Sequence, residues 1–229
     1  MPSLALVVAT CKWEQWRECW ESWLTPDIEP WLIDNSEDNI GVLPSLQLGF
    51  ACTKADLVAF IHDDVICREP GWEKRVLKAF EDPKVGLVGF GGAVSHGAPD
   101  IYETPYDYRQ LGRSGYMSNV DDAEVHGVRF SGERNVAVLD GFAMIVRREL
   151  LDAVGGWPTE TPVGYIGYDY WLSCIVHELG YAIKFVGIRC HHFGGRAAVK
   201  AAPEFRGDYD AAHLYIYERF RNVLPWTCA

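Results

Sequence analysis

The sequence has no apolar run long enough to cross a lipid bilayer. Its longest apolar stretches, such as residues 57–61 and 136–139, fall far short of the roughly 20 residues that a membrane-spanning helix needs. Residues 1–10 also lack the basic start and the extended apolar region of a secretory signal. We therefore expect a cytoplasmic protein with no transmembrane segment.

The sequence also lacks any pair of cysteines with CxxC spacing. Its seven cysteines are odd in number and widely scattered, which argues against a zinc site and a thioredoxin-like site. Several lie within apolar runs, where a free cysteine behaves as a small hydrophobic residue. We predict reduced core residues at Cys11, Cys19, Cys52, Cys67, Cys174, Cys190 and Cys228.

Basic residues are too few for an overall basic surface. The chain has 21 Lys and Arg against 32 Asp and Glu, and its formal net charge is −11. A protein that binds nucleic acid through the phosphates normally presents a basic face, so nucleic acid is a disfavoured partner. An acidic active site that requires a cation fits this balance better.

The glycine-rich loops of two large nucleotide-binding classes are absent. The turn after the first expected strand reads Ala9-Thr10-Cys11-Lys12-Trp13, without the glycines of a Rossmann dehydrogenase, and Gly89-Phe90-Gly91-Gly92 comes late and lacks the third spaced glycine. No GxxxxGK[ST] loop occurs, which excludes a P-loop enzyme. A sugar nucleotidyltransferase is disfavoured because no Gly-rich loop with Arg or Lys follows the first strand.

The first 90 residues alternate between strand and helix patterns. Short apolar strands are expected at residues 4–9, 31–33, 57–61 and 85–90. Between them lie a helix with Trp13, Trp16, Trp20 and Trp23 on one face, a mixed helical segment at 43–52, and a helix that starts near Pro70. This order predicts an α/β fold with a mainly parallel sheet.

Residues 91–134 interrupt the alternation, and we expect a long irregular segment there. Regular patterns return as strands at 136–139 and 143–146, a short helix at 149–154, a helix at 169–179 that Gly180 ends, and a strand at 182–188. The tail has apolar residues at helical spacing. The 229 residues contain no internal repeat and no Ser/Gly linker, so we predict one domain.

The main chemical motif is Phe60-Ile61-His62-Asp63-Asp64-Val65, where an apolar strand runs into two carboxylates and an imidazole. Ligands of open α/β sheets bind beyond the carboxyl ends of the strands, and His62 and Asp64 can project to the same side. Hard oxygen ligands suit Mg²⁺ or Mn²⁺ on a diphosphate. The alternative is a pair of Asp residues that only forms a turn.

Three further groups have a chemical and a structural interpretation. Asp34, after the second strand, can accept hydrogen bonds from a nucleoside or form an Asx-turn. Asp169, after a Gly-rich loop, can act as a general base or cap a helix. His191 and His192, followed by two glycines, can hold a metal or a phosphate, or be buried core histidines.

In this order the motifs resemble the family-2 glycosyltransferases. The resemblance covers roughly residues 4–197 and rests on Ala9-Thr10, Ile33-Asp34-Asn35-Ser36, the His62-Asp63-Asp64 segment, residues 138–148 with Gly155-Gly156-Trp157, Tyr168-Asp169, and His191-His192-Phe193-Gly194-Gly195. It implies a GT-A, Rossmann-like domain with a mixed, mostly parallel sheet flanked by helices. The nucleotide-sugar half would span about 1–95 and the acceptor half about 96–199, followed by a helical tail at 200–229.

The resemblance also implies a metal-dependent transfer from a nucleotide-sugar. The DxD-like triplet is His62-Asp63-Asp64, with Asp64 as principal ligand of Mn²⁺ or Mg²⁺ and a histidine near the C-terminus completing the site, either His191 or His192. Asp63 would face the ribose or the sugar. By the same resemblance, Ala9, Thr10 and Asp34 would contact the nucleoside, and Asp140 and Gly141 would border the transferred sugar and the acceptor.

The family's catalytic base is the Asp of a Glu-Asp pair, which here reads Tyr168-Asp169. Asp169 is therefore the expected base of an inverting transfer, with UDP-sugar as the donor. The acceptor is not identified: a glycan, a lipid-linked sugar, a protein, a small molecule and a modified base all remain open. The alternative is a non-catalytic module that binds a nucleotide-sugar or a carbohydrate, which the loss of the acidic partner at Tyr168 would suit.

Overall fold

The computed structural model describes residues 2–97, 116–121, 128–193 and 204–228. A seven-stranded sheet forms the centre of the molecule, with the strand order β10-β13-β5-β12-β3-β1-β2. The strands are β1 (Leu4–Thr10), β2 (Ile28–Asp34), β3 (Leu57–Ile61), β5 (Val85–Gly89), β10 (Glu133–Val136), β12 (Ala143–Arg147) and β13 (Ala182–Val186).

Five of the seven strands, β1, β2, β3, β5 and β13, run in the same direction. β1 pairs in parallel with β2 and β3, and β5 pairs in parallel with β13. β12 lies between β3 and β5 and runs antiparallel to both, and β10 is antiparallel to β13. The mixed, mostly parallel α/β sheet predicted from the alternating pattern is confirmed.

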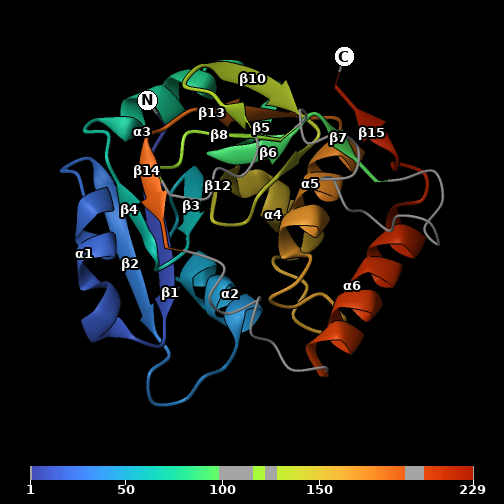
Figure 1. The fold of residues 1–229 in the computed structure, drawn as a ribbon, viewed down its shortest axis with the longest axis horizontal. Coiled ribbons are helices and arrows are strands. Elements are labelled where there is room, and N and C mark those ends of the chain that lie inside the picture. The colour runs from blue at the N-terminus through green and yellow to red at the C-terminus, as the bar shows by residue number, and fades with distance from the viewer. Residues whose placement is uncertain (1, 98–115, 122–127, 194–203, 229) are drawn as a thin grey trace.

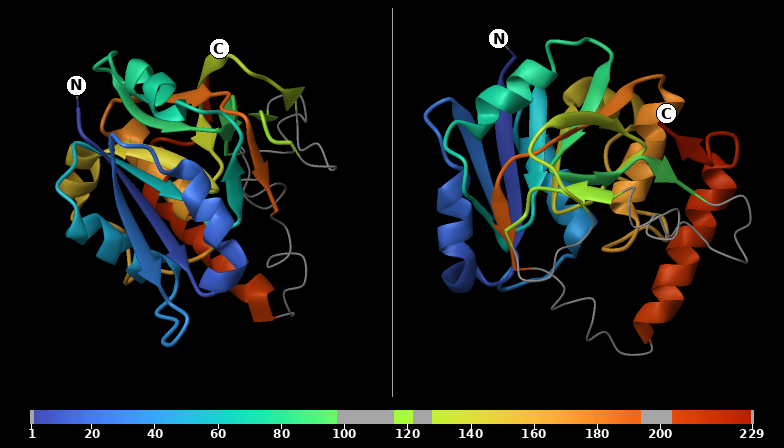
Figure 2. Two further views of the ribbon diagram at one scale, coloured as in Figure 1. Left: turned by 90° about the vertical axis from the view of Figure 1, so that its left-hand side faces the viewer. Right: turned by 45° about the horizontal axis from the view of Figure 1, so that its top comes forward.

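Helices cover both faces of the sheet because alternate side chains of each strand enter different cores. In β1, Val7 packs with one core while Leu6 and Val8 pack with the other. The helices are α1 (Trp13–Trp23), α2 (Val42–Cys52), α3 (Trp72–Ala79), α4 (Arg148–Val154), α5 (Tyr168–Glu178) and α6 (Glu204–Phe220). Side chains of α1 and α3 belong to one core, and those of α2, α4, α5 and α6 to the other. In Figure 1 and in the right-hand view of Figure 2, α1 and α6 lie at opposite ends of the molecule.

The described part of residues 91–134, which was predicted as irregular, holds three strands of a second sheet. This sheet has the order β11-β6-β8-β9, with β6 (Gly91–Ala93), β8 (Tyr116–Ser118), β9 (Val128–Arg129) and β11 (Val138–Leu139). The predicted strand at 136–139 is therefore wrong as one element, because Val136 ends β10 in the large sheet and Val138 begins β11 in the small one. Strands of two or three residues are too short for a periodic pattern. Residues 98–115 and 122–127 lie outside the described residues.

Short ribbons complete the fold. β4 (Val65–Cys67) pairs with β14 (Cys190–His192), and β7 (Ser95–His96) pairs with β15 (Trp226–Thr227), which follows α6 in the tail. Within the described residues, no helix is both long and apolar enough to span a membrane. All seven cysteines are free thiols, but the core prediction is wrong for Cys11 and Cys52, which are exposed.

Candidate active site

The candidate site lies at the edge of the sheet where β1, β2 and β3 end. The antiparallel β12 begins at the same edge, because Ala143 is paired with Ile61, and the His62 backbone N–H donates to the Phe142 carbonyl over 2.9 Å. The residues after β3 therefore face those that precede β12. This register brings His62-Asp63-Asp64 next to Asp140 and Gly141, which are almost 80 residues away in sequence.

Three side chains form a group that can hold a metal ion. His62, Asp64 and His192 each offer one donor atom, and these atoms all lie within 4.8 Å of one another. One Asp64 oxygen, Oδ1, is 3.9 Å from His62 Nδ1 and 3.3 Å from His192 Nε2. The side chains are 22–29% exposed, so the group is reachable from solvent. Two imidazoles and a carboxylate form a set that fits divalent transition metals.

His192 reaches this group through the pairing of β14 with β4. His192 is paired with Val65, and the Phe193 backbone N–H donates to the Asp64 carbonyl over 3.0 Å. The His192 ring stacks on Phe142, with ring centroids 5.0 Å apart. The strand thus holds the imidazole beside Asp64.

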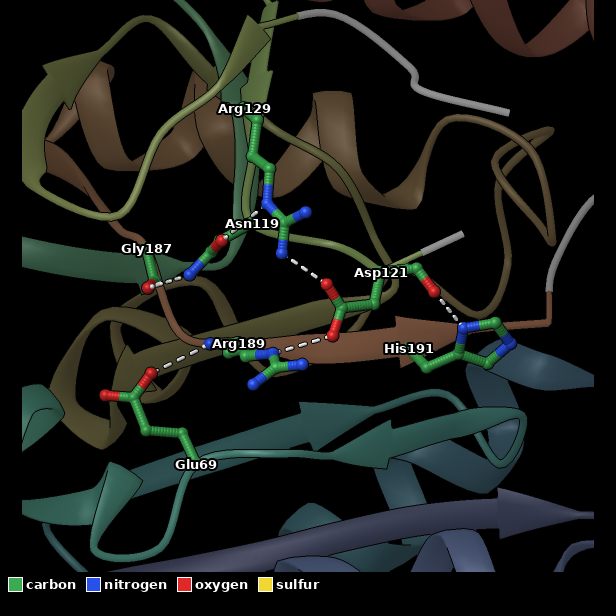
Figure 3. Close-up of polar contacts among 7 residues, drawn as sticks. All are labelled: Glu69, Asn119, Asp121, Arg129, Gly187, Arg189 and His191. Carbon is green, nitrogen blue, oxygen red and sulfur yellow. Dashed lines mark hydrogen bonds and ion pairs between the residues drawn. The ribbon is translucent and has the colours of Figure 1, made fainter. Parts of the chain in front are cut away.

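His191 points elsewhere, because adjacent side chains of a strand leave it on opposite sides. Its Nδ1 contacts the Asp121 backbone carbonyl, as Figure 3 shows. The Asp121 carboxylate binds both Arg129 and Arg189, at 2.7 Å from Arg189 Nε. The structure therefore brings His192, and not His191, to the Asp64 group. No pattern in the sequence points to Asp121.

Charge and burial set the protonation of the group. Burial and the neighbouring His192 lower the pKa of His62 to about 4, although Asp64 and Asp140 oppose the shift. Burial alone would raise the pKa of Asp64, but the hydrogen bond and the charge of His192, together with His62, lower it overall. At neutral pH the group thus presents a neutral His62 beside an ionised Asp64, the forms that bind metals.

The predicted nucleoside-side residues lie at the neighbouring strand ends. Thr10, buried at the end of β1, donates its hydroxyl to Asp63 over 2.7 Å. Burial raises the pKa of Asp63, and the Thr10 hydrogen bond opposes the shift. Asp34 is exposed and accepts hydrogen bonds from the backbone and the hydroxyl of Ser36, so the Asx-turn foreseen as its alternative is present. Ala9 is half-buried in β1 and is paired with Ile33, the residue before Asp34.

Asp140, Gly141 and Asp169 form the opposite wall. Asp169 Oδ2 accepts the Gly141 N–H over 3.2 Å and its Oδ1 accepts the Tyr170 N–H over 2.9 Å. Burial and the negative charge of Asp140 raise the pKa of Asp169 to about 7, although these hydrogen bonds oppose the shift. Asp140 itself accepts hydrogen bonds from Tyr116 and from the Phe142 N–H. A carboxyl that titrates near neutrality suits a general base.

Tyr168, which stands where the family has an acidic residue, links the His62, Asp64 and His192 group to the wall formed by Asp140, Gly141 and Asp169. It is 4% exposed, and its hydroxyl lies 2.5 Å from His62 Nε2 and 2.9 Å from the Gly141 carbonyl oxygen. A Cβ at Gly141 would lie 2.2 Å from this hydroxyl, so only glycine fits there. The departure from the family's Glu-Asp pair was the available signal for this residue.

Comparison with solved structures supports the fold. The chain is similar to the mannosyltransferase PcManGT from Pyrobaculum calidifontis, solved in complex with GDP-Man and Mn²⁺, with a TM-score of 0.50 and 16% identity over 94% of this chain and 70% of that one. A197 from STIV is also similar, with a TM-score of 0.46 and 14% identity over 83% of this chain and 85% of that one. The first likeness identifies the fold as that of a GT-A glycosyltransferase.

Comparison of sequences gives the family. No curated protein matches the chain significantly. The sequence profile of the glycosyltransferase-like family matches residues 44–190, which are more than half of the chain. This range includes His62, Asp64, Asp140, Gly141, Tyr168 and Asp169, and it ends before His192. The chain therefore belongs to the glycosyltransferase-like family.

Proposed function

We propose that this chain is a metal-dependent, inverting glycosyltransferase that moves a sugar from a nucleoside diphosphate to an acceptor hydroxyl. One observation carries the proposal. The His62, Asp64 and His192 group and the Asp169 carboxyl, drawn from distant parts of the sequence, are joined by hydrogen bonds through Tyr168 and Gly141. Such a transfer needs a site for a diphosphate-bound cation beside a general base.

His62, Asp64 and His192 are the residues that would hold the cation. Two imidazole nitrogens favour a transition metal over Mg²⁺, which prefers oxygen ligands, so Mn²⁺ is the stronger prediction. When bound, such a cation offsets the negative charge that the departing diphosphate gains.

The chain's own residues account for the remaining steps. Thr10 and Asp63, at the ends of β1 and β3, would orient the nucleoside and ribose, with Ala9 and Asp34 beside them. Asp140 and Gly141 would border the sugar. The acceptor hydroxyl loses its proton to Asp169. Its oxygen bonds to the anomeric carbon on the face opposite the diphosphate, and the bond from that carbon to the diphosphate oxygen breaks.

The nucleoside diphosphate of the donor can be tested directly. UDP is the nucleoside diphosphate predicted from the family resemblance, whereas the mannosyltransferase of similar fold was solved with GDP-Man. A thermal-shift panel of nucleoside diphosphates and their sugars, with and without Mn²⁺, addresses both bases, because ligands of the native state raise the melting temperature. We expect one nucleoside diphosphate to give a shift that requires the cation.

Asp64→Ala is the key variant for that panel. It should remove the cation-dependent shift, because it removes the one oxygen that both imidazoles face. Asp27→Ala, an exposed carboxylate outside the site, is the matched control and should keep the shift. A shift that survives in Asp64→Ala would remove this group from the metal site.

Slow hydrolysis of the donor separates an enzyme from a binding module of the same fold. We expect the wild type to release free sugar from the bound donor slowly, with water in place of the acceptor, and Asp169→Asn to release almost none. Tight binding without any hydrolysis or transfer would support the non-catalytic module instead.

A further inference from the structure

The hydroxyl of Tyr168 lies between the His62, Asp64 and His192 group and the wall formed by Asp140, Gly141 and Asp169. Tyr168 is the first residue of α5, directly before Asp169. Its ring is buried against Trp157, with ring centroids 6.0 Å apart, so the position of the hydroxyl is well defined. That hydroxyl has two partners, His62 Nε2 at 2.5 Å and the Gly141 carbonyl oxygen at 2.9 Å.

The count of protons assigns the direction of both hydrogen bonds. A tyrosine hydroxyl has one proton to donate, and a carbonyl oxygen can only accept. The proton of Tyr168 therefore goes to the Gly141 carbonyl, and the second bond requires His62 to donate its Nε2–H. In a neutral imidazole with a proton on Nε2, the other nitrogen, Nδ1, has the free lone pair.

The free nitrogen is the one that faces the rest of the group. His62 Nδ1 lies 3.9 Å from Asp64 Oδ1, which in turn lies 3.3 Å from His192 Nε2. Ligand atoms about 2.1 Å from one metal ion lie roughly 3–3.5 Å apart, so only a small adjustment separates these atoms from a common ion. A metal-bound histidine typically donates its other N–H to a fixed acceptor, which holds the ring and its tautomer.

We propose that Tyr168 is a positioning residue of the metal site, which holds His62 with Nδ1 free toward the cation and links that site to the base at Asp169. The inference rests on the proposed function. Tyr168 stands where the family has the Glu of the Glu-Asp pair, and His62 stands where it has the first Asp of the DxD motif. The proposal gives Tyr168 the role of supporting His62 as a metal ligand. The two departures, His62 and Tyr168, are direct partners in the structure.

Tyr168→Phe tests the proposal because it removes one oxygen and keeps the ring. Binding of Mn²⁺ alone is followed by the loss of the EPR signal of free Mn²⁺. Loss of such a supporting partner lowers metal affinity by about 10- to 100-fold, and that is the expected result. Tyr116→Phe is the control, since it is also a buried tyrosine but donates to Asp140 rather than to a metal ligand; it should change Mn²⁺ affinity less than about twofold.

An unchanged Mn²⁺ affinity in Tyr168→Phe would overturn the proposal, as would an equal loss in both variants. Nitrogen NMR of ¹⁵N-histidine-labelled wild type, without metal, provides a second readout that does not depend on the variant's folding. We expect the His62 signals of a protonated Nε2 and an unprotonated Nδ1, and the opposite tautomer would contradict the assignment. Wild type that binds no Mn²⁺ at all would instead disprove the metal dependence of the proposed function.

Discussion

At the scale of single residues, burial and neighbouring groups shift the pKa values of two carboxyls of the site in opposite directions. Asp64 has a lowered pKa because His192 and His62 outweigh its burial, whereas Asp169 has a raised pKa because burial and Asp140 outweigh two N–H donors. One carboxyl is thus kept ionised, as a metal ligand requires, and the other titrates near neutral pH, as a base requires.

The pH dependence of transfer should follow Asp169. Only the ionised carboxylate accepts a proton, so kcat/KM should rise with pH and level off above the pKa of about 7. Asp169→Asn should lower transfer by about 100- to 10,000-fold and leave nucleotide affinity within a few-fold. Initial rates between pH 5.5 and 8.5, with nucleotide binding followed separately, check both. A variant of normal activity would remove Asp169 from this role.

At the scale of elements, the start of α5 sets the position of both Tyr168 and Asp169. Gly167 precedes the helix with φ of 84°, a left-handed conformation that side chains disfavour. A Cβ there would lie 2.9 Å from Ile216 of α6, so the two helices pack closely at this point. At the other end of α5, Arg219 of α6 binds Glu178 with two hydrogen bonds of 2.7 Å.

Gly167→Ala should therefore affect transfer as well as stability. The backbone conformation costs about 1 kcal/mol for alanine, and the contact with Ile216 must also be relieved by a shift of α5 or α6. Gly180→Ala is a matched control, because Gly180 follows α5 with φ of 80° but has no atom within 4 Å of an added Cβ. Melting curves should show a loss in both variants, and rate assays should show a transfer loss of tenfold or more only in Gly167→Ala.

Equal transfer in the two glycine variants would show that the packing of α6 on Gly167 does not control the position of Tyr168 and Asp169. A double variant that combines Gly167→Ala with Ile216→Val should recover part of the loss, because it removes the methyl group in the path of the new Cβ.

At the scale of the whole molecule, the C-terminal segment closes the fold over buried histidines. Trp226 of β15 is paired with His96 of β7, and its ring stacks on His177 of α5 with centroids 4.2 Å apart. His213 of α6 contacts the ring of Tyr170, 5.3 Å away between centroids. All three histidines are less than 8% exposed, so the tail is integrated into the domain.

Acid should destabilise the protein through His96 and His177. Burial, together with His177 and His213, lowers the pKa of His96 to about 3, and burial also lowers that of His177. An unfolded histidine takes up a proton below about pH 6.5 and the buried one does not, so unfolding becomes more favourable as the pH falls from 6.5 toward 3. Asp169 has a raised pKa, so its protonation favours the folded state as the pH falls and opposes the effect of the histidines. The contribution of a histidine is therefore measured by comparing the wild type with a variant at each pH.

His96→Gln is the variant for that comparison. Melting temperatures at pH 7 and pH 5 should differ less in His96→Gln than in the wild type, because the variant has lost one group that the unfolded state protonates. The same fall in both proteins would show that other groups dominate the acid sensitivity.

Local patterns predicted the large elements because their signals lie in neighbouring residues. The apolar runs of β1, β3 and β5 and the face of four tryptophans in α1 are set by side-chain spacing. The candidate groups His62, Asp63, Asp64 and Asp169 were recognisable because polar residues follow an apolar strand or precede a helix, whereas Asp140 followed from the family resemblance. The short strands β6, β8, β9 and β11 had too few residues for a pattern, and they exist because each pairs with a distant partner.

The sequence alone therefore determined the α/β class and the mainly parallel sheet, since both depend on local spacing, and the order of its motifs pointed to the glycosyltransferase family. Only the tertiary structure separated the positions of His191 and His192, because the pairing of β14 with β4 turns the first toward Asp121 and the second toward Asp64. It alone also gave Tyr168 a partner at His62, 106 residues away. Hydrogen bonds at that separation follow from how α5, β3 and β12 pack, and no local pattern encodes them.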